Sequence, residues 1–176
     1  MTSQPPVPPA GASGVPAVNI VECWLFRVTA AGRLEVLLMR RSAGRIFPGL
    51  WQPVTGRPEA GETAPGAALR EVQEETALGW EHLEAFYTLD QVVQLYNLAR
   101  NGISHLVLFA ARVRPDAEVT ISYEHDDLRW VEPAEAVRDA IWPAYRESLA
   151  RIQRLVGEPG WARWFELDQE GRRTAG

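Results

Sequence analysis

The chain has 176 residues, a net charge of −5, 46% apolar residues and 23% charged residues. These values are typical of one globular domain with its own core. No apolar run approaches the roughly 18–20 residues that a membrane span needs. The negative charge gives no general attraction to nucleic acid or to an anionic membrane. An anionic substrate would therefore need a positive group to hold it, and a metal ion is the usual one.

The N-terminal residues 1–17 are rich in Pro, Gly and Ala and lack the basic start and apolar stretch of a secretory signal. We expect them to form a flexible tail. The single cysteine, Cys23, excludes an intrachain disulfide and fits a reducing compartment, so we expect a cytoplasmic protein. Cys23 lies inside an apolar run, which favours a buried core residue over a reactive thiol.

Runs of β-forming residues separated by turn signals predict a series of strands. Ala31-Gly32 marks one turn, and Asn101-Gly102 is a strong hairpin signal. A loop punctuated by Gly and Pro spans 42–51. The expected strands are 18–28, 34–40, 51–55, 83–98 (as one or two strands), 103–113 and 128–131.

Helices are predicted in the middle and at the end of the chain. The helix 64–78 has Thr63 as a plausible N-cap and Pro65 in its first turn. Pro133 opens a second helical stretch, which Pro143 interrupts. The last expected helix, 144–157, has Tyr145, Leu149, Ile152 and Val156 on one face. Strands around one central helix, with more helix at the end, predict an α/β sandwich with a mixed sheet.

Three carboxylates share one face of the predicted helix 64–78. At 100° per residue, Glu71, Glu74 and Glu75 fall on an arc about 100° wide. The core-facing arc holds Pro65, Ala68, Leu69, Val72 and Thr76. Like charges at this spacing cost about 0.2–0.5 kcal/mol per pair. A divalent cation would offset that cost, and clustered oxygen ligands suit Mg²⁺. A solvated acidic face is the alternative for an isolated pattern of this kind.

The residues around this helix have a specific spacing. Gly56 is followed by five residues and Glu62, then by seven residues and the run REVQEETAL, from Arg70 to Leu78. The segment resembles the Nudix box, Gly-x5-Glu-x7-Arg-Glu-apolar-x-Glu-Glu-x-Gly-apolar, at eight of nine specified places. Chance gives such a match on the order of once in a million chains or fewer. The resemblance implies a Nudix hydrolase domain over 18–157, an α/β/α sandwich with a mixed β-sheet and a loop–helix–loop.

The one departure from the box is Ala77, where the family has a glycine that ends the helix, often with φ > 0. Alanine in that conformation costs about 1 kcal/mol, so we expect Gly79 to take over the cap and the helix end to be slightly displaced. The resemblance also implies supporting roles. Arg70 would orient the neighbouring carboxylates by charge-assisted hydrogen bonds. Glu62 would brace the loop or join the outer shell of the metal, and Gly56 would let the backbone turn.

The resemblance implies that Glu71, Glu74 and Glu75 bind Mg²⁺, with Mn²⁺ as an alternative. The metal would neutralise phosphate oxygens and activate water for in-line attack on a phosphorus, without a covalent enzyme intermediate. Glu124 is the candidate for a further ligand or the base, because it precedes Trp130 in a stretch that resembles the Glu-His segment of some members. An acidic surface turn is the alternative. Weaker candidates follow it directly: His125, Asp126 and Asp127.

The segments WQPVTG, residues 51–56, and GETAP, residues 61–65, resemble one Nudix branch in particular. That branch hydrolyses dihydroneopterin triphosphate and nucleoside triphosphates such as dATP, releasing pyrophosphate. We therefore expect a triphosphate with a purine- or pterin-like ring as partner, and no nucleic acid. Tyr96, 18 residues past Leu78, keeps a dinucleoside polyphosphate open, whereas the lack of Pro in 92–96 disfavours a nucleotide sugar. A non-catalytic nucleotide-sensing module is disfavoured because all box carboxylates are present.

A flat ring needs an aromatic or apolar wall, and phosphates need cations. Phe47, Trp51 and Tyr96 are candidate walls, although each fits the protein core equally well. The candidate phosphate-binding residues, which are ordinary surface charges in the alternative interpretation, are Arg40, Arg41 and Arg45.

The C-terminal segment 158–176 carries three large aromatic residues, Trp161, Trp164 and Phe165, which are costly to leave exposed. We expect this segment to pack on the body of the domain or against a second subunit. Many relatives are dimers, and the resemblance therefore favours a homodimer.

Overall fold

A computed structural model describes residues 17–98, 101–139 and 141–175, so residues 1–16 of the expected tail lie outside the described residues. The strands are β1 (Ile20–Val28), β2 (Leu34–Arg41), β3 (Trp51–Gln52), β4 (Val54–Gly56), β5 (Leu83–Asn97), β6 (Gly102–Val113), β7 (His125–Val131) and β8 (Glu166–Leu167). The helices are α1 (Ala64–Thr76), α2 (Pro133–Asp139), α3 (Ala144–Gly157), α4 (Pro159–Ala162) and the 3-10 helix η1 (Trp80–His82). None of the helices in the described part of the chain is long and apolar enough to cross a membrane.

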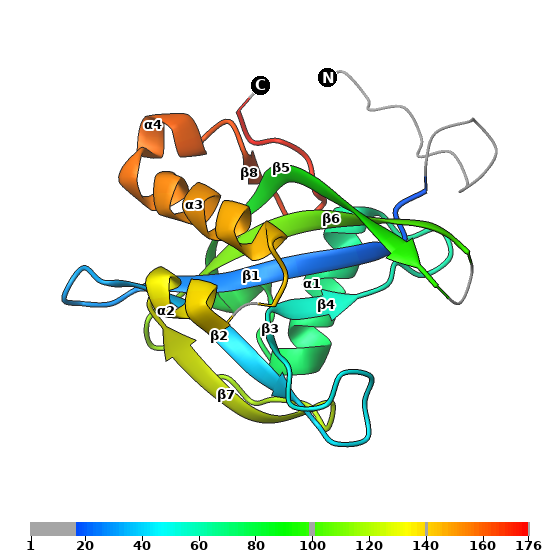
Figure 1. The fold of residues 1–176 in the computed structure, drawn as a ribbon. Helices are drawn as coiled ribbons and strands as arrows, with labels where there is room; N and C mark the ends of the chain where they lie inside the picture. Colours follow the sequence, from blue (N-terminus) through cyan, green and yellow to red (C-terminus); the bar gives the residue numbers. More distant parts are fainter. Residues whose placement is uncertain (1–16, 99–100, 140, 176) are drawn as a thin grey trace.

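The strands form one mixed sheet. Its order is β3-β2-β1-β6-β5-β8, with β4 paired to β1 and β7 paired to β2. β1 runs parallel to β6, and the other pairs are antiparallel. Figure 1 shows α1 behind the sheet and α3 in front of it. The predicted α/β/α sandwich with a mixed sheet is therefore confirmed.

β1 supplies both halves of the core because it is buried on both faces. Cys23 and Leu25 belong to the half that includes residues of α1, and Trp24 and Phe26 belong to the half that includes residues of α3. The exposed fraction of Cys23 is 0%, which confirms that it is a core residue. A strand buried on both faces normally carries a continuous apolar run. Glu22, which is 2% exposed, is the exception in β1.

Helix α1 begins as the sequence predicts, with the Thr63 hydroxyl accepting a backbone hydrogen bond at 3.2 Å. It ends at Thr76, because Ala77 itself takes the left-handed conformation with φ 59°. The expectation that Gly79 caps the helix is wrong, since Gly79 is extended with φ −86°. The strain at Ala77, about 1 kcal/mol, is tolerated because this turn carries Leu78 into the core, where its exposed fraction is 1%.

The second half of the sheet differs from the expected strands at their ends. β5 is one long strand, which is one of the two expected alternatives, with an irregularity in its pairing between Thr88 and Gln91. Asn101 has φ 46° directly before β6 begins at Gly102, as a tight turn requires. β7 begins at His125 rather than at residue 128.

The C-terminal segment packs on the body of the domain. Ala162 is 5% exposed, and Trp161 and Phe165 pack against the half of the core that includes α3, whereas Trp164 remains 50% exposed. β8 then adds to β5, with Leu167 opposite Phe86. The sheet therefore extends beyond residue 157, where the sequence places the end of the domain.

Candidate active site

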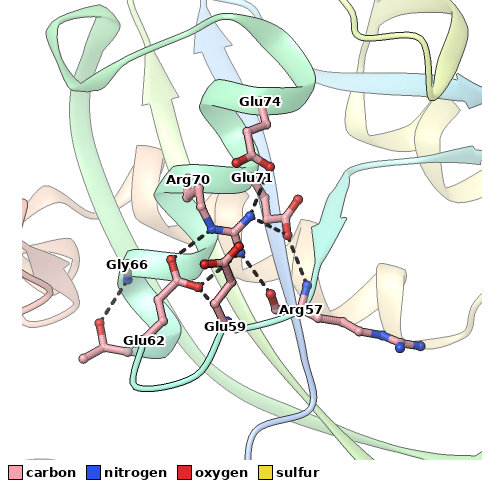
Figure 2. A network of polar contacts seen from close by, with 8 residues as sticks. Arg57, Glu59, Glu62, Gly66, Arg70, Glu71 and Glu74 are labelled. Carbon is pink, nitrogen blue, oxygen red and sulfur yellow. Dashed lines mark hydrogen bonds and ion pairs between the residues drawn. The ribbon is translucent and has the colours of Figure 1, made fainter.

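Arg70 lies at the centre of a hydrogen-bond network that joins α1 to the preceding loop (Figure 2). Its Nε donates to Glu62 Oε1 at 3.0 Å. Its Nη1 donates to Glu71 Oε1 at 3.0 Å and to Glu74 Oε2 at 3.1 Å. Its Nη2 donates to the carbonyl of Arg57 at 3.0 Å. The planar guanidinium thus fixes three carboxylates and the loop backbone at once, which a single-point cation could not do.

Gly56 ends β4 directly under the side chain of Glu71. A Cβ at this position would lie 1.9 Å from Glu71 Cδ and 2.0 Å from Glu71 Oε1. Gly56 is not among the residues with positive φ, so the glycine is required by this close approach rather than by the backbone turn that the sequence suggested. The packing also lets the Arg57 amide donate to Glu71 Oε1 at 3.2 Å.

The three carboxylates predicted to share one face of α1 lie in different surroundings. The Glu74 side chain is 58% exposed. The Glu75 side chain is 6% exposed, and its Oε2 is buried without a hydrogen-bond partner among the described residues. Burial, followed by the charges of Glu71 and Glu124, raises the pKa of Glu75 to about 8, against a hydrogen bond from the Thr55 backbone that lowers it. The helix arc alone did not predict this burial.

Glu124 lies close enough to Glu75 to raise the pKa of its carboxyl, although the two residues are far apart in the sequence. Its Oε1 pairs with Arg45 Nη2 at 3.1 Å. The next residue, His125, is buried, and its Nδ1 lies 3.8 Å from Glu75 Oε2. Burial, together with Arg41 and Arg45, lowers the pKa of His125 to about 4, so its ring is neutral at pH 7.

The donor set of this region consists of carboxylate oxygens, the ligands that Mg²⁺ and other hard cations prefer. The unpartnered Glu75 oxygen and the mutual repulsion of Glu71, Glu75 and Glu124 are the features that a divalent cation would relieve. The side chains are not gathered into a ready ligand sphere: in the described ranges no group of three or more His, Cys, Asp or Glu is arranged to hold a metal ion. The composition of the site therefore fits a metal. Glu71 Oε1, however, already accepts hydrogen bonds from the Arg57 amide and from Arg70 Nη1.

Arg40 and Trp51 lie opposite one another on the paired strands β2 and β3. Arg40 Nε donates to Asp126 at 2.7 Å, and its Nη2 lies 3.6 Å from Asp127. The Trp51 ring is contacted by the guanidinium groups of Arg40, at 5.7 Å, and Arg129, at 4.2 Å. The two aspartates are thus paired with an arginine rather than directed at Glu75.

A cavity of about 450 Å³ lies on the face of the sheet that α3 covers. Its lining is mostly apolar and comes from β1, β3, β4, β5, β6, the loop before β3, the segment that leads into α3 and the start of that helix. The lining residues are Ile20, Glu22, Phe47, Leu50, Gln52, Thr55, Val93, Gln94, Leu95, Leu106, Leu108, Trp142, Pro143, Ala144 and Tyr145. Its size and apolar walls suit a flat ring.

One of the three predicted aromatic walls lines this cavity. Phe47 lies in its wall and meets Trp142 edge to face, with ring centroids 6.2 Å apart. Trp51 and Tyr96 do not line it. Tyr96 is 60% exposed on β5, where its hydroxyl donates to Asn101 Oδ1 at 2.5 Å, because the alternation of the strand directs it away from the α3 side.

Sequence reasoning missed the polar residues of the cavity, above all Glu22. This carboxyl accepts a hydrogen bond from Trp24 Nε1 at 2.8 Å and is also hydrogen-bonded by Tyr145. The signal was present in the run VNIVECWLF, in which a single charged residue interrupts an apolar strand. A buried charge in such a run indicates either a structural partner or a site.

The carboxylate group and the cavity lie on opposite faces of the sheet, but one short segment touches both. The side chains of Gln52 and Thr55 line the cavity, and Gln52 Nε2 donates to Thr55 Oγ1 at 2.9 Å. The Thr55 backbone hydrogen-bonds to the Glu75 carboxyl, and Gly56 follows under Glu71. A ligand that passes over the edge of β3 and β4 would therefore meet both regions.

Comparison with known proteins identifies the family to which this chain belongs. The family model for the NUDIX domain matches residues 20–152. An octanoyltransferase from Myxococcus xanthus is 37% identical over 121 residues, 66% of this chain and 32% of that protein. A dihydroneopterin triphosphate diphosphatase from Escherichia coli (strain K12) is 54% identical over 54 residues, 31% of this chain and 34% of that protein. The matches thus span about a third of the length of these two relatives.

Solved structures agree with the family. The crystal structure of a binary complex of a C. elegans Ap4A hydrolase superposes with a TM-score of 0.67 and 25% identity, covering 80% of this chain and 98% of that chain. The match of the family model extends over most of the described residues, including the whole loop–helix–loop of the box. The chain therefore belongs to the Nudix family, whose homologues include pyrophosphohydrolases, enzymes that act on acid anhydrides.

Proposed function

We propose that the chain catalyses Mg²⁺-dependent hydrolysis of a phosphoanhydride bond in a nucleoside-triphosphate-like substrate, releasing pyrophosphate. The observation that carries the proposal is the Glu75 carboxyl, which is buried beside Glu71 and Glu124 with one oxygen unpartnered in the described structure. Burying a carboxyl among other carboxyls is unfavourable unless a cation neutralises them. Because these neighbouring carboxyls are unfavourable for the fold by themselves, a bound cation best explains why they lie together.

In this proposal Glu71, Glu74 and Glu75 hold the metal, with Mn²⁺ as an alternative to Mg²⁺. When bound, the divalent cation neutralises phosphate oxygens and lowers the pKa of a coordinated water. Arg70 keeps Glu71 and Glu74 in position through hydrogen bonds of 3.0 and 3.1 Å. Glu124 is the further ligand or the base. Such fixed positioning supplies a large part of the rate enhancement in reactions of this class.

The substrate class follows from the two regions taken together. The charges of Arg41 and Arg45 both lower the pKa of His125, which lies beside Glu75, so the two arginines are near the carboxylates. The carboxylates and these arginines together suit a metal-bound phosphate chain. The cavity suits the ring, and Gln52 and Thr55 connect the two. The similarity to a dihydroneopterin triphosphate diphosphatase, over 54 residues, supports a triphosphate that carries a purine- or pterin-like ring.

A second candidate is a dinucleoside polyphosphate, which the likeness to the C. elegans Ap4A hydrolase supports. A nucleotide sugar and a non-catalytic sensing module complete the alternatives. The test is a panel of dATP, dGTP, 7,8-dihydroneopterin triphosphate, Ap4A and ADP-ribose at millimolar Mg²⁺ and in EDTA, with products resolved by chromatography. Pyrophosphate with a monophosphate, formed only with metal, is the expected result. Preferred cleavage of Ap4A into two nucleotides would overturn the triphosphate proposal, and binding without any cleavage would replace it with the sensing module.

A further inference from the structure

Glu22 is the one charged side chain among the described residues that line the cavity. Its position follows from β1, in which alternate residues face the α3 side of the sheet and Glu22 falls between Ile20 and Trp24 on that side. Only 2% of the residue is exposed. Glu22 pairs in register with Thr55 of β4, so it lies beside the segment that links the cavity to the box helix.

This carboxyl is unfavourable for the fold by itself. No ion pair to Glu22 is found in the part of the chain that the structure describes, and its described partners are the neutral donors Trp24 and Tyr145. Burial raises the pKa of Glu22 to about 8, and the two hydrogen bonds lower it only in part. An apolar residue of similar volume would fill this position without a desolvation cost. The residue is therefore best explained by a ligand that supplies hydrogen-bond donors inside the cavity.

The kind of ligand follows from the chemistry of the carboxylate. Burial keeps the Glu22 carboxyl protonated near neutral pH in the free protein, whereas two N–H donors favour its ionised form, so binding of such a ligand releases the proton. The ionised carboxylate accepts hydrogen bonds at both oxygens and donates none, and it pairs best with two adjacent N–H donors. Guanine and pterin rings carry such an edge, a lactam N–H beside an exocyclic amino group. Adenine instead presents one acceptor beside one donor on the corresponding edge. The apolar residues around Glu22, such as Leu106 and Leu108, would contact the faces of either ring equally.

We propose that Glu22 selects the ring of the substrate by pairing its carboxylate with the adjacent lactam and amino N–H groups of a guanine- or pterin-type ring. This inference rests on the proposed function and narrows its substrate class. Glu22 acts on specificity, and it takes no part in the chemistry at the carboxylates of α1, which lie on the other face of the sheet.

Ring selection can be measured without hydrolysis, by calorimetric binding of dGMP, dIMP and dAMP in EDTA at a pH above the Glu22 pKa of about 8, where the carboxyl is ionised. We expect the wild-type protein to bind dGMP more tightly than dAMP by about tenfold to a hundredfold, the range of one bidentate pair. The dIMP ring lacks the amino group and should bind about tenfold more weakly than dGMP. This comparison varies only the ligand, so it does not depend on how a variant folds. Tighter binding of dAMP, or equal binding of dGMP and dIMP, would overturn the proposal.

The matched variant is Glu22→Gln, which keeps the shape but presents one acceptor and one donor. Its preference for dGMP should be lost, and dAMP should bind at least as well as to the wild type. The control is Glu84→Gln on β5, where Glu84 pairs with Arg112 outside the cavity and its loss should leave the preference unchanged. An undiminished preference in Glu22→Gln would refute the role. If the substrate panel shows no hydrolysis while the dGMP preference persists, the proposed function fails and the ring selection stands. If the panel shows hydrolysis but dGMP is not preferred, only the ring selection is rejected.

Discussion

Replacing Gly56 by alanine should disable the site through Glu71. An ordinary carbon contact is at least 3.4 Å, whereas the new Cβ would lie 1.9 Å from Glu71 Cδ, so that atom must move by about 1.5 Å (3.4 − 1.9). The shift breaks the hydrogen bonds of Glu71 Oε1 with Arg70 Nη1, at 3.0 Å, and with the Arg57 amide, at 3.2 Å. Each bond to a charged group contributes about 1.5–3 kcal/mol, of which water regains part. We therefore expect a loss of about 2–3 kcal/mol in unfolding free energy.

Turnover of the triphosphate should fall about 100-fold in Gly56→Ala, because displacing a catalytic group by this distance costs about that much. Urea denaturation and steady-state hydrolysis at saturating Mg²⁺ measure the two effects. Gly44→Ala is the matched control, since a Cβ at Gly44 meets no atom within 4 Å. A double-mutant cycle with Glu71→Ala isolates the cause, because without the Glu71 carboxyl Gly56→Ala should be nearly neutral for stability. Equal destabilisation by Gly56→Ala in both backgrounds would show that the close approach to Glu71 is not the reason for the glycine.

Three further predictions concern the helix end, the buried carboxyl and the network. Ala77→Gly removes the strain of φ 59° and should stabilise the fold by about 1 kcal/mol, or about 2–4 °C in thermal denaturation; no increase would contradict the strain. The pKa of Glu22 rises from 4.5 to about 8 on folding, so the folded protein holds a proton that the unfolded chain has lost. The stabilising contribution of the protonated Glu22 to the free energy of unfolding is present below pH 4.5 and is lost as the pH rises to 8. Urea denaturation across this range in EDTA should therefore show a shallower decline in Glu22→Gln than in the wild type, and identical slopes would refute the shifted pKa. Arg70→Lys keeps the charge but loses the fork that binds Glu62 and Glu71. Its turnover should fall at least about tenfold with the metal-binding carboxylates intact, and unchanged turnover would mean that the network does not position them.

The parts of the fold that depend on local pattern were predicted from the sequence. Thr63 caps α1 because its hydroxyl satisfies a backbone amide of the first turn, and the spacing from Gly56 to Leu78 predicted the loop–helix–loop. The helix end was wrong because the prediction weighed only the local strain of Ala77. The burial of Leu78, which the whole fold determines, has the larger effect.

The parts of the site that depend on distant segments were not predicted. The arc of α1 grouped Glu74 with Glu75, but the neighbouring strands bury only Glu75. Tyr96 was a candidate ring wall because it is aromatic, and the alternation of β5 leaves it exposed. Trp142 and Tyr145 reach the cavity because α3 packs across the sheet, a long-range contact that no local pattern specifies.

The central claim is that the carboxylates of α1 hold a divalent cation for hydrolysis, and Glu75 is its most specific element. The direct test is the turnover of a nucleoside triphosphate at millimolar Mg²⁺ by the wild type and by Glu75→Gln, which keeps the size of the buried side chain. We expect turnover to fall by about 10³-fold or more in the variant, with its thermal stability in EDTA equal to or above that of the wild type. Near-normal turnover in a folded Glu75→Gln protein would contradict the account.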